Sequence, residues 1–247
     1  MKNIANEKKT IGILGGMGPE ATSLFFHKII QKTKADKDQD HIRIIIYNDP
    51  VIPDRTDAIL GIGISPVTTA MSGIKFLEAS HVDFITIPCV TLHYFYDEII
   101  DSLSVPVLSI VTETLNHIKI EYPDIKRIGI LATTGTYKGR IFEKEFHQEN
   151  YDIMTPDDKA KNNLMDAIYG SDGIKAGYTT GDAKERIIHV ANDLIKKGAE
   201  LIVGGCTEIP IVIKPGDLSV PFIDTLSVLA DSAILKSGHK LKKTLIV

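Results

Sequence analysis

Residues 9–16 have the sequence KTIGILGG, in which an aliphatic run stops at two glycines. Pro19 follows shortly, and proline is well tolerated in the first turn of a helix because its missing N–H has no partner there. The pattern therefore predicts a buried strand that leads into a helix. Comparable aliphatic strands are predicted at residues 41–50, 82–88, 105–111, 126–135, 199–205 and 220–225.

Helical segments separate these strands. Residues 71–78 and 187–195, for example, carry apolar side chains at the spacing of one helix face. Continuous apolar strands that alternate with helices predict an α/β fold whose mostly parallel sheets are covered on both faces. Ligands of such sheets bind beyond the carboxyl ends of the strands, so the residues that directly follow each strand are the candidates for chemistry.

The chain also contains an internal repeat. The sequence IGIL occurs at residues 11–14 and again at 128–131, which is 117 positions later, and Cys89 and Cys206 are separated by the same 117 positions. A shared offset that joins strands and cysteines predicts two similar α/β halves related by pseudo-two-fold symmetry, with the active site in the cleft between them. We place the first half at residues 1–122 and the second at 123–247, and expect the C-terminal segment to cross back to the first half.

Composition restricts the class of function. The net charge is −4 and no basic stripe with interleaved aromatic residues is present, which argues against a nucleic-acid partner. No run approaches the roughly 18 apolar residues of a membrane span, and residues 1–9, MKNIANEKK, lack the apolar core of a secretory signal. We therefore expect a cytoplasmic protein with two free thiols and a basic or short final segment at residues 239–247.

The two cysteines are the strongest candidates for catalysis. A lone cysteine is more often a small buried hydrophobe than a nucleophile, but Cys89 and Cys206 both follow a predicted strand and precede a predicted helix. A helix N-terminus stabilises a thiolate and so lowers the pKa of a thiol. One thiolate could remove an α-proton while the other thiol delivers a proton to the opposite face. Donors to the resulting carbanion or enolate could come from Gly15, Gly16, Thr91, Thr133, Thr134 and Thr207.

Five motifs resemble the aspartate/glutamate racemase family: IGILGGMGPEAT, YNDPVIPDRT, PCVTLHYFYDEI, IGILATTGT and GGCTEIP. They lie between Ile11 and Pro210 in the family's order and together are more specific than any one of them. The resemblance implies an isomerase with two similar α/β domains, commonly a homodimer, that needs neither metal nor pyridoxal phosphate. It also implies that Cys89 and Cys206 are the acid–base pair.

The resemblance extends to substrate binding. Arg55 in PDRT and Lys175 in GIKAG match the family's cationic positions. A guanidinium binds a carboxylate through two parallel hydrogen bonds, and two cations suit a substrate with two carboxylates, namely aspartate or glutamate. For each residue the alternative is an ordinary position on the protein surface. We assign substrate binding to Met17, Arg55, Thr91, Thr133, Thr134, Lys175 and Thr207.

One position departs from the family pattern. The family usually has Cys-Asn-Thr at the first cysteine, whereas this chain has Cys89-Val90-Thr91. Valine offers a substrate no hydrogen bond, which leaves three alternatives open: a changed substrate preference, reduced activity, or a protein that binds acidic amino acids without racemising them.

Other functions compete with this interpretation. Residues 16–21 fit the nucleotide-binding pattern G-x-G-x-x-A, but Pro19 removes an N–H that a pyrophosphate would use, and the expected acidic residue does not end the second strand at the usual distance. A maleate isomerase, decarboxylase or hydantoin racemase on the same scaffold is another alternative. Cys89 and His93 alone fall short of the four ligands of a structural zinc site, so we predict no metal.

Overall fold

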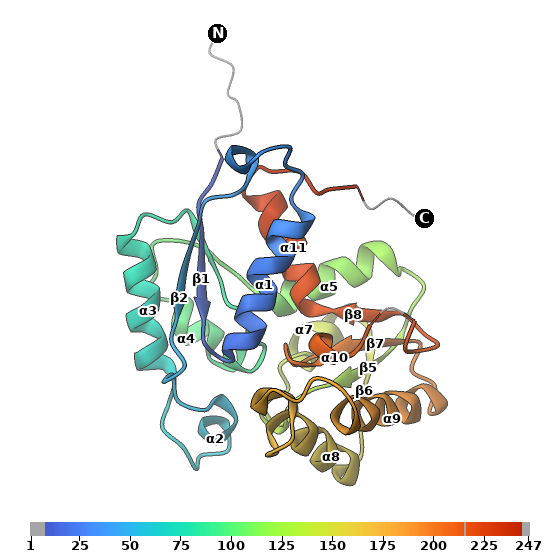
Figure 1. Cartoon of the computed structure of the whole chain (residues 1–247). Coiled ribbons are helices and arrows are strands. Elements are labelled where there is room, and N and C mark those ends of the chain that lie inside the picture. Colours follow the sequence, from blue (N-terminus) through green and yellow to red (C-terminus); the bar gives the residue numbers. More distant parts are fainter. Residues whose placement is uncertain (1–7, 215, 244–247) are drawn as a thin grey trace.

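The computed structural model describes residues 8–214 and 216–243, which fold around two parallel four-stranded sheets (Figure 1). The first sheet has the order β2-β1-β3-β4 and the second the order β6-β5-β7-β8, so the two sheets share one topology. The predicted α/β fold with two similar halves is confirmed. The strands are β1 (Ile11–Gly15), β2 (Ile44–Asn48), β3 (Phe84–Thr86), β4 (Val107–Leu108), β5 (Arg127–Leu131), β6 (Asp152–Met154), β7 (Leu201–Gly204) and β8 (Phe222–Asp224).

Strand register reproduces the internal repeat. In the first sheet Ile11 pairs with Phe84 of β3, and in the second Ile128 pairs with Leu201 of β7. Both members of the second pair lie 117 positions after their counterparts. The offset seen in the sequence therefore relates whole strand pairs, and it brings Cys89 and Cys206 to equivalent positions after β3 and β7.

Capping side chains explain where several helices begin. Ser109 accepts a hydrogen bond from the backbone of the first turn of α5, Asp157 does so for α8, and Asp224 for α11. The helices are α1 (Pro19–Lys32), α2 (Arg55–Ile59), α3 (Val67–Ala79), α4 (Tyr96–Ile100), α5 (Ile110–Glu121), α6 (Thr134–Lys138), α7 (Glu143–Phe146), α8 (Asp158–Tyr169), α9 (Asp182–Lys196), α10 (Ile209–Val212) and α11 (Thr225–Lys236). Short 3₁₀ turns include Thr91–Phe95 and Ile174–Ala176.

The last helix joins the two sheets into one packed unit. Although α11 follows β8 of the second sheet, it packs against α1 and α5, which follow strands of the first sheet (Figure 1). Ion pairs of 2.7 Å link Lys28 to Asp224 and Lys32 to Asp231. A single hydrophobic core contains buried residues of both sheets and of these helices. The halves therefore share buried apolar area, and the boundary at residue 122 stays a prediction.

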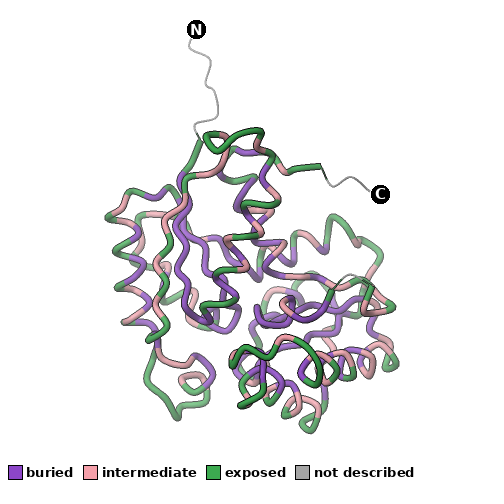
Figure 2. Tube along the Cα trace, viewed as in Figure 1, coloured by how far each residue is buried: buried purple, intermediate pink, exposed green. Residues whose placement is uncertain are grey.

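Two sequence expectations need correction. Residues 41–50 were expected to form a buried strand, but β2 lies at the edge of its sheet and is only half-buried, with Ile46 37% exposed (Figure 2). Residues 105–111 yield only the two-residue strand β4, because Ser109 caps α5 directly afterwards.

The chain's ends bear on two further predictions. Residues 1–7 of the N-terminal stretch and 244–247 of the final segment lie outside the described residues, so what was predicted from those positions stays a prediction. Within the ranges 8–214 and 216–243, no helix combines the length and apolar character needed to cross a membrane.

Candidate active site

Both cysteines line one small chamber between the sheets. Cys89 and Cys206 are free, buried thiols that follow the carboxyl ends of β3 and β7. The inner chamber has a volume of only about 10 Å³, which is space for about one water molecule. Its walls are formed by Met17, Arg55, Cys89, Val90, Thr91, Thr133, Tyr169, Lys175, Cys206, Thr207 and Glu208. The structure thus brings together eight of the nine residues assigned above to catalysis or substrate binding, all except Thr134.

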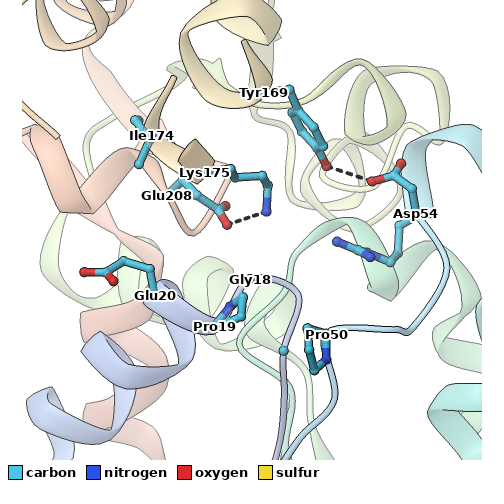
Figure 3. A pocket seen from close by; sticks show the side chains of 11 residues that line it. Gly18, Pro19, Glu20, Pro50, Asp54, Tyr169, Ile174, Lys175 and Glu208 are labelled. Atoms are coloured by element: carbon cyan, nitrogen blue, oxygen red, sulfur yellow. Dashed lines mark hydrogen bonds and ion pairs between the residues drawn. The ribbon is translucent and has the colours of Figure 1, made fainter. Parts of the chain in front are cut away.

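A larger outer cavity of about 400 Å³ adjoins the inner chamber. The two spaces share Arg55, Tyr169, Lys175 and Glu208, so these four side chains stand between the cysteines and the outer cavity. Figure 3 shows Tyr169, Lys175 and Glu208 at the outer cavity. The remaining lining residues of the outer cavity are Gly16, Gly18, Pro19, Glu20, Pro50, Asp54 and Ile174. Residues of the β1–α1 loop, of α2 and of the segment after α8 therefore form the approach to the thiols.

A hydrogen-bonded chain connects Cys206 to a lysine. The Cys206 thiol donates to Glu208 Oε2 at 2.9 Å, and Lys175 Nζ donates to Glu208 Oε1 at 2.6 Å (Figure 3). A Cβ at Gly18 would lie 3.3 Å from Glu208 Oε1, so glycine lets the β1–α1 loop approach this pair closely. Glu208 is buried, and the carboxylate has its charge balanced by the ammonium.

The electrostatics of Cys206 differ from the sequence expectation. Burial raises the pKa of the Cys206 thiol well above its ordinary value, and the Glu208 carboxylate raises it further, although Lys175 opposes both effects. The predicted lowering of this pKa by a helix N-terminus is wrong, because α10 has only four residues and begins after Glu208. Burial disfavours the charge on Lys175, but Glu208 and Cys206 outweigh burial and raise the pKa of the ammonium.

Arg55 is a buried cation beside the other cysteine. It opens α2 and is 7% exposed, so the alternative of an ordinary surface arginine is wrong. Its Nη1 donates to the carbonyls of Ile52 and Pro53, both at 3.1 Å, while its Nε has no hydrogen-bond partner among the described residues. Burial disfavours the charge, but Cys89, Tyr169 and Asp54 outweigh it and raise the pKa of Arg55. Arg55 also lines both cavities, so its side chain borders the space that a ligand would enter.

Threonine hydroxyls from both halves meet at the wall of the inner chamber. Thr91 Oγ1 lies 3.1 Å from Thr133 Oγ1 and 3.3 Å from Thr136 Oγ1, and the last two lie 3.2 Å apart. Thr136 was not predicted from the sequence. Thr134 was predicted but lines neither cavity, and its backbone N–H donates to Met165 Sδ at 3.2 Å. Thr207 donates to Glu208 Oε2 at 3.3 Å.

His93 fixes the loop that carries Cys89. Its Nδ1 lies 2.9 Å from the Cys89 carbonyl, and its Nε2 accepts from the Ile110 N–H at 3.2 Å, which together require the neutral ring with the proton on Nδ1. Burial lowers the pKa of His93 to about 4, consistent with a neutral imidazole. In the part of the chain that the structure describes, no three His, Cys, Asp or Glu side chains are grouped as a metal site would require.

Tyr169 and Asp54 line the outer cavity but were not predicted from the sequence. The Tyr169 hydroxyl donates to Asp54 Oδ2 at 3.2 Å and so joins the end of α8 to the residue before α2 at the outer cavity (Figure 3). The Lys175 ammonium also lies 5.2 Å from the centre of the Tyr169 ring. No motif in the sequence marks Tyr169, because the hydrogen bond spans 115 positions.

The glycine-rich loop after β1 does not offer a phosphate site. The Gly16 N–H donates to Thr22 Oγ1 at 3.0 Å, so this amide is already occupied within the loop. Gly18 faces the Lys175–Glu208 pair instead of an open surface. The glycines therefore serve close packing at the active site, which argues against the nucleotide-binding alternative.

Comparison with known proteins supports the resemblance seen in the motifs. The family model for Asp/Glu/hydantoin racemases matches residues 14–233. The broad specificity amino-acid racemase RacX of Bacillus subtilis is 31% identical over 230 residues, which cover 91% of this chain and 96% of that protein.

Solved structures agree with this assignment. Aspartate racemase from Picrophilus torridus is 32% identical, with a TM-score of 0.85 over 95% of this chain and 96% of that chain. Glutamate racemase from Francisella tularensis has a TM-score of 0.69 at 18% identity, over 93% of this chain and 82% of that chain, and so shares the fold. The chain therefore belongs to the Asp/Glu/hydantoin racemase family.

Proposed function

We propose that this protein racemises an acidic amino acid, aspartate or glutamate, without a cofactor, and that Cys89 and Cys206 are its acid–base pair. The observation that carries the proposal is that both thiols line one buried chamber at equivalent strand ends of two similar halves. Its family membership and its similarity to amino-acid racemases support the reaction type.

The proposed reaction balances with the two thiols alone. One thiolate accepts the α-proton, the C–H electron pair stays on the substrate as a carbanion or enolate, and the other thiol donates its proton to the opposite face. The product is the mirror image of the substrate. The thiolate that accepted the α-proton is now a thiol, and the thiol that donated its proton is now a thiolate. The hydroxyls of Thr91 and Thr133 are placed at the chamber wall, where they could donate to the developing negative charge.

Two cations support an acidic substrate. Arg55 and Lys175 both stand between the inner chamber and the outer cavity, so each could bind one carboxylate. Arg55 makes no hydrogen bond through its Nε among the described residues, whereas the Lys175 ammonium already donates to Glu208. A second carboxylate would therefore share Lys175 with Glu208.

A wider substrate range is the second candidate function. The sharing of Lys175 with Glu208 weakens the case for a dedicated site for a second carboxylate. The relative RacX is described as a broad specificity amino-acid racemase. The cytoplasmic location and the homodimer stay predictions.

Proton NMR in D₂O tests both candidates. The full chain is incubated with the L and D forms of individual amino acids, and loss of each α-proton signal is followed with time. Loss with aspartate or glutamate supports the proposal, and loss with many amino acids supports the wider range. The control is the double variant Cys89→Ser, Cys206→Ser. Exchange that persists in this control, or no exchange with any acidic amino acid in the parent, contradicts the proposal.

A further inference from the structure

We propose that Glu208 is a positioning residue that keeps the resting proton on Cys206, so that Cys206 is the resting acid and Cys89 the resting base. This inference rests on the proposed two-thiol racemisation, since it assigns the first proton transfer of that reaction. The assignment follows from the contacts of Glu208 and from a difference between the two halves.

Glu208 accepts hydrogen bonds on both oxygens. Oε1 accepts from the Lys175 ammonium at 2.6 Å, and Oε2 accepts from the Cys206 thiol at 2.9 Å and from Thr207 at 3.3 Å. An ammonium has only protons to give, and an ionised carboxylate accepts on both oxygens. The 2.6 Å distance is that of a charge-assisted bond. Glu208 is therefore a carboxylate, and the proton between it and Cys206 belongs to the sulfur.

The pseudo-symmetric position in the first half carries no charge. Thr91 lies two residues after Cys89, as Glu208 lies two residues after Cys206. Cys89 instead shares the wall of the inner chamber with the Arg55 guanidinium. Cys206 donates to a carboxylate, whereas Thr91 offers Cys89 no charged partner at the equivalent position. The carboxylate favours the protonated form of Cys206, which leaves Cys89 as the base of the proposed pair.

This placement gives the reaction a starting direction. An enantiomer whose α-hydrogen faces Cys89 can react with the resting enzyme directly, because Cys89 is the base. Cys206 then gives its proton to the opposite face. The reaction leaves a Cys206 thiolate next to the Glu208 carboxylate, where charge repulsion favours its reprotonation. Lys175 limits this repulsion, because its ammonium is bound to the same carboxylate.

Alkylation of the full chain with iodoacetamide tests the assignment without any substrate. Peptide mass spectrometry reports the rate at each cysteine as a function of pH, and the pH at half-maximal rate is compared between variants, since burial affects the rate of both thiols. In the parent we expect Cys89 to be alkylated before Cys206 at neutral pH. Glu208→Gln should lower the Cys206 midpoint by about one pH unit, which raises its alkylation at neutral pH about tenfold, and Lys175→Met should raise the midpoint.

Two further variants make the test specific. Glu20→Gln removes a carboxylate from the outer cavity that makes no hydrogen bond to either thiol in the described residues, and it should leave the Cys206 midpoint in place. Glu208→Asp keeps the charge and should keep the midpoint above that of Glu208→Gln, even if it packs less well. Alkylation of Cys206 ahead of Cys89 in the parent, or equal midpoints in the parent and Glu208→Gln, would overturn the assignment.

The outcome is separate from that of the racemase proposal. Alkylation reports protonation of the thiols and needs no turnover. A parent protein that exchanges no α-proton but shows the expected midpoints would refute the activity and leave the placement of the proton supported. If the parent exchanges the α-proton but the Cys206 midpoint is the same in the parent and in Glu208→Gln, the activity is supported and the placement of the proton is refuted.

Discussion

The Tyr169 hydroxyl donates to the Asp54 carboxylate at 3.2 Å and connects α8 of the second half to the start of α2 in the first half. Asp54 also caps α2 by accepting from the Asp57 N–H at 3.0 Å. The residue that holds the start of α2, and with it Arg55, is thus tied to the opposite wall of the outer cavity. The inner chamber, with a volume of about 10 Å³, is too small for an amino acid in this conformation, so we expect the Tyr169–Asp54 contact to affect how a substrate is admitted and held.

Loss of the Tyr169 hydroxyl should weaken substrate retention. A hydrogen bond to a charged group contributes about 1.5 kcal/mol or more, so Tyr169→Phe should raise the KM about tenfold with a smaller change in kcat. The ring remains, and with it the contact to Lys175. Steady-state kinetics on both enantiomers measure the effect. Tyr178→Phe, at an exposed tyrosine, is the control. An unchanged KM would show that this hydrogen bond does not hold the substrate in place.

Single cysteine variants test the two-thiol mechanism. Cys89→Ser and Cys206→Ser should each lower net racemisation by at least about a hundredfold, because a hydroxyl is far harder to ionise than a thiol. Each variant retains one thiol and should exchange the α-proton of one enantiomer with solvent, with opposite preference in the two variants. Deuterium incorporation by NMR distinguishes the enantiomers. Racemisation at the parent rate in both variants would refute the mechanism.

Much of this site follows from the sequence, because strand ends carry chemistry in parallel α/β folds. The offset of 117 residues places both cysteines correctly, since it is also the offset between β3 and β7, the equivalent strands of the two sheets. Thr134, in contrast, was predicted from the sequence but lines neither cavity. Thr133 caps α6, so Thr136, one turn later, returns to the same face while Thr134 points elsewhere. The start of α6 had to be known before these threonines could be told apart.

Other features depend on tertiary contacts that no local pattern encodes. Tyr169 meets Asp54 only because α8 and α2 approach across the outer cavity. The effect of Glu208 on Cys206 depends on the side-chain conformation, since the same residue pointing outward would leave the thiol unaffected. Likewise, the exposure of β2 follows from its place at the sheet edge, which its run of isoleucines does not predict.

Substitution of Arg55 tests carboxylate binding. Arg55→Lys should lower kcat/KM at least tenfold, because an ammonium cannot reproduce the planar pair of hydrogen bonds, and Arg55→Ala should lower it further. Arg55 also holds the carbonyls of Ile52 and Pro53, so thermal unfolding is measured alongside kinetics. Arg43→Lys, at an exposed position, is the control. Kinetics equal to the parent in both Arg55 variants would return Arg55 to a purely structural role.

Val90 is the position to change for substrate range. It is 1% exposed, lines the inner chamber and belongs to the shared hydrophobic core. Val90→Asn adds amide groups facing the substrate, so α-proton exchange with aspartate or glutamate should rise if valine limits it. A buried amide without a partner costs about 1–3 kcal/mol, so the free energy of unfolding should fall. Proton NMR in D₂O measures the exchange, and denaturant unfolding measures the stability. A loss of stability with no change in exchange would assign Val90 to packing alone.

His93 should make the protein sensitive to mild acid. Its pKa is lowered by burial from 6.5 to about 4, while the unfolded chain keeps the ordinary value. The stabilisation by neutral His93 is complete above pH 6.5 and is lost as the pH falls towards 4, because only the unfolded state then binds the proton. Below pH 4 the folded protein is protonated as well and the loss ends. The total loss in the free energy of unfolding from this titration is about 3 kcal/mol.

A variant without this titration isolates the effect from that of the carboxylates. His93→Gln should be less stable than the parent at pH 7, since it loses the bonds to Cys89 and Ile110. Between pH 6.5 and 4, however, its free energy of unfolding should fall less steeply than that of the parent, so that the two curves converge. His27→Gln, at an exposed histidine, should keep the parent's slope. Parallel curves for the parent and His93→Gln would mean that His93 is protonated equally in the folded and unfolded states, contrary to its buried, neutral position between the Cys89 loop and α5.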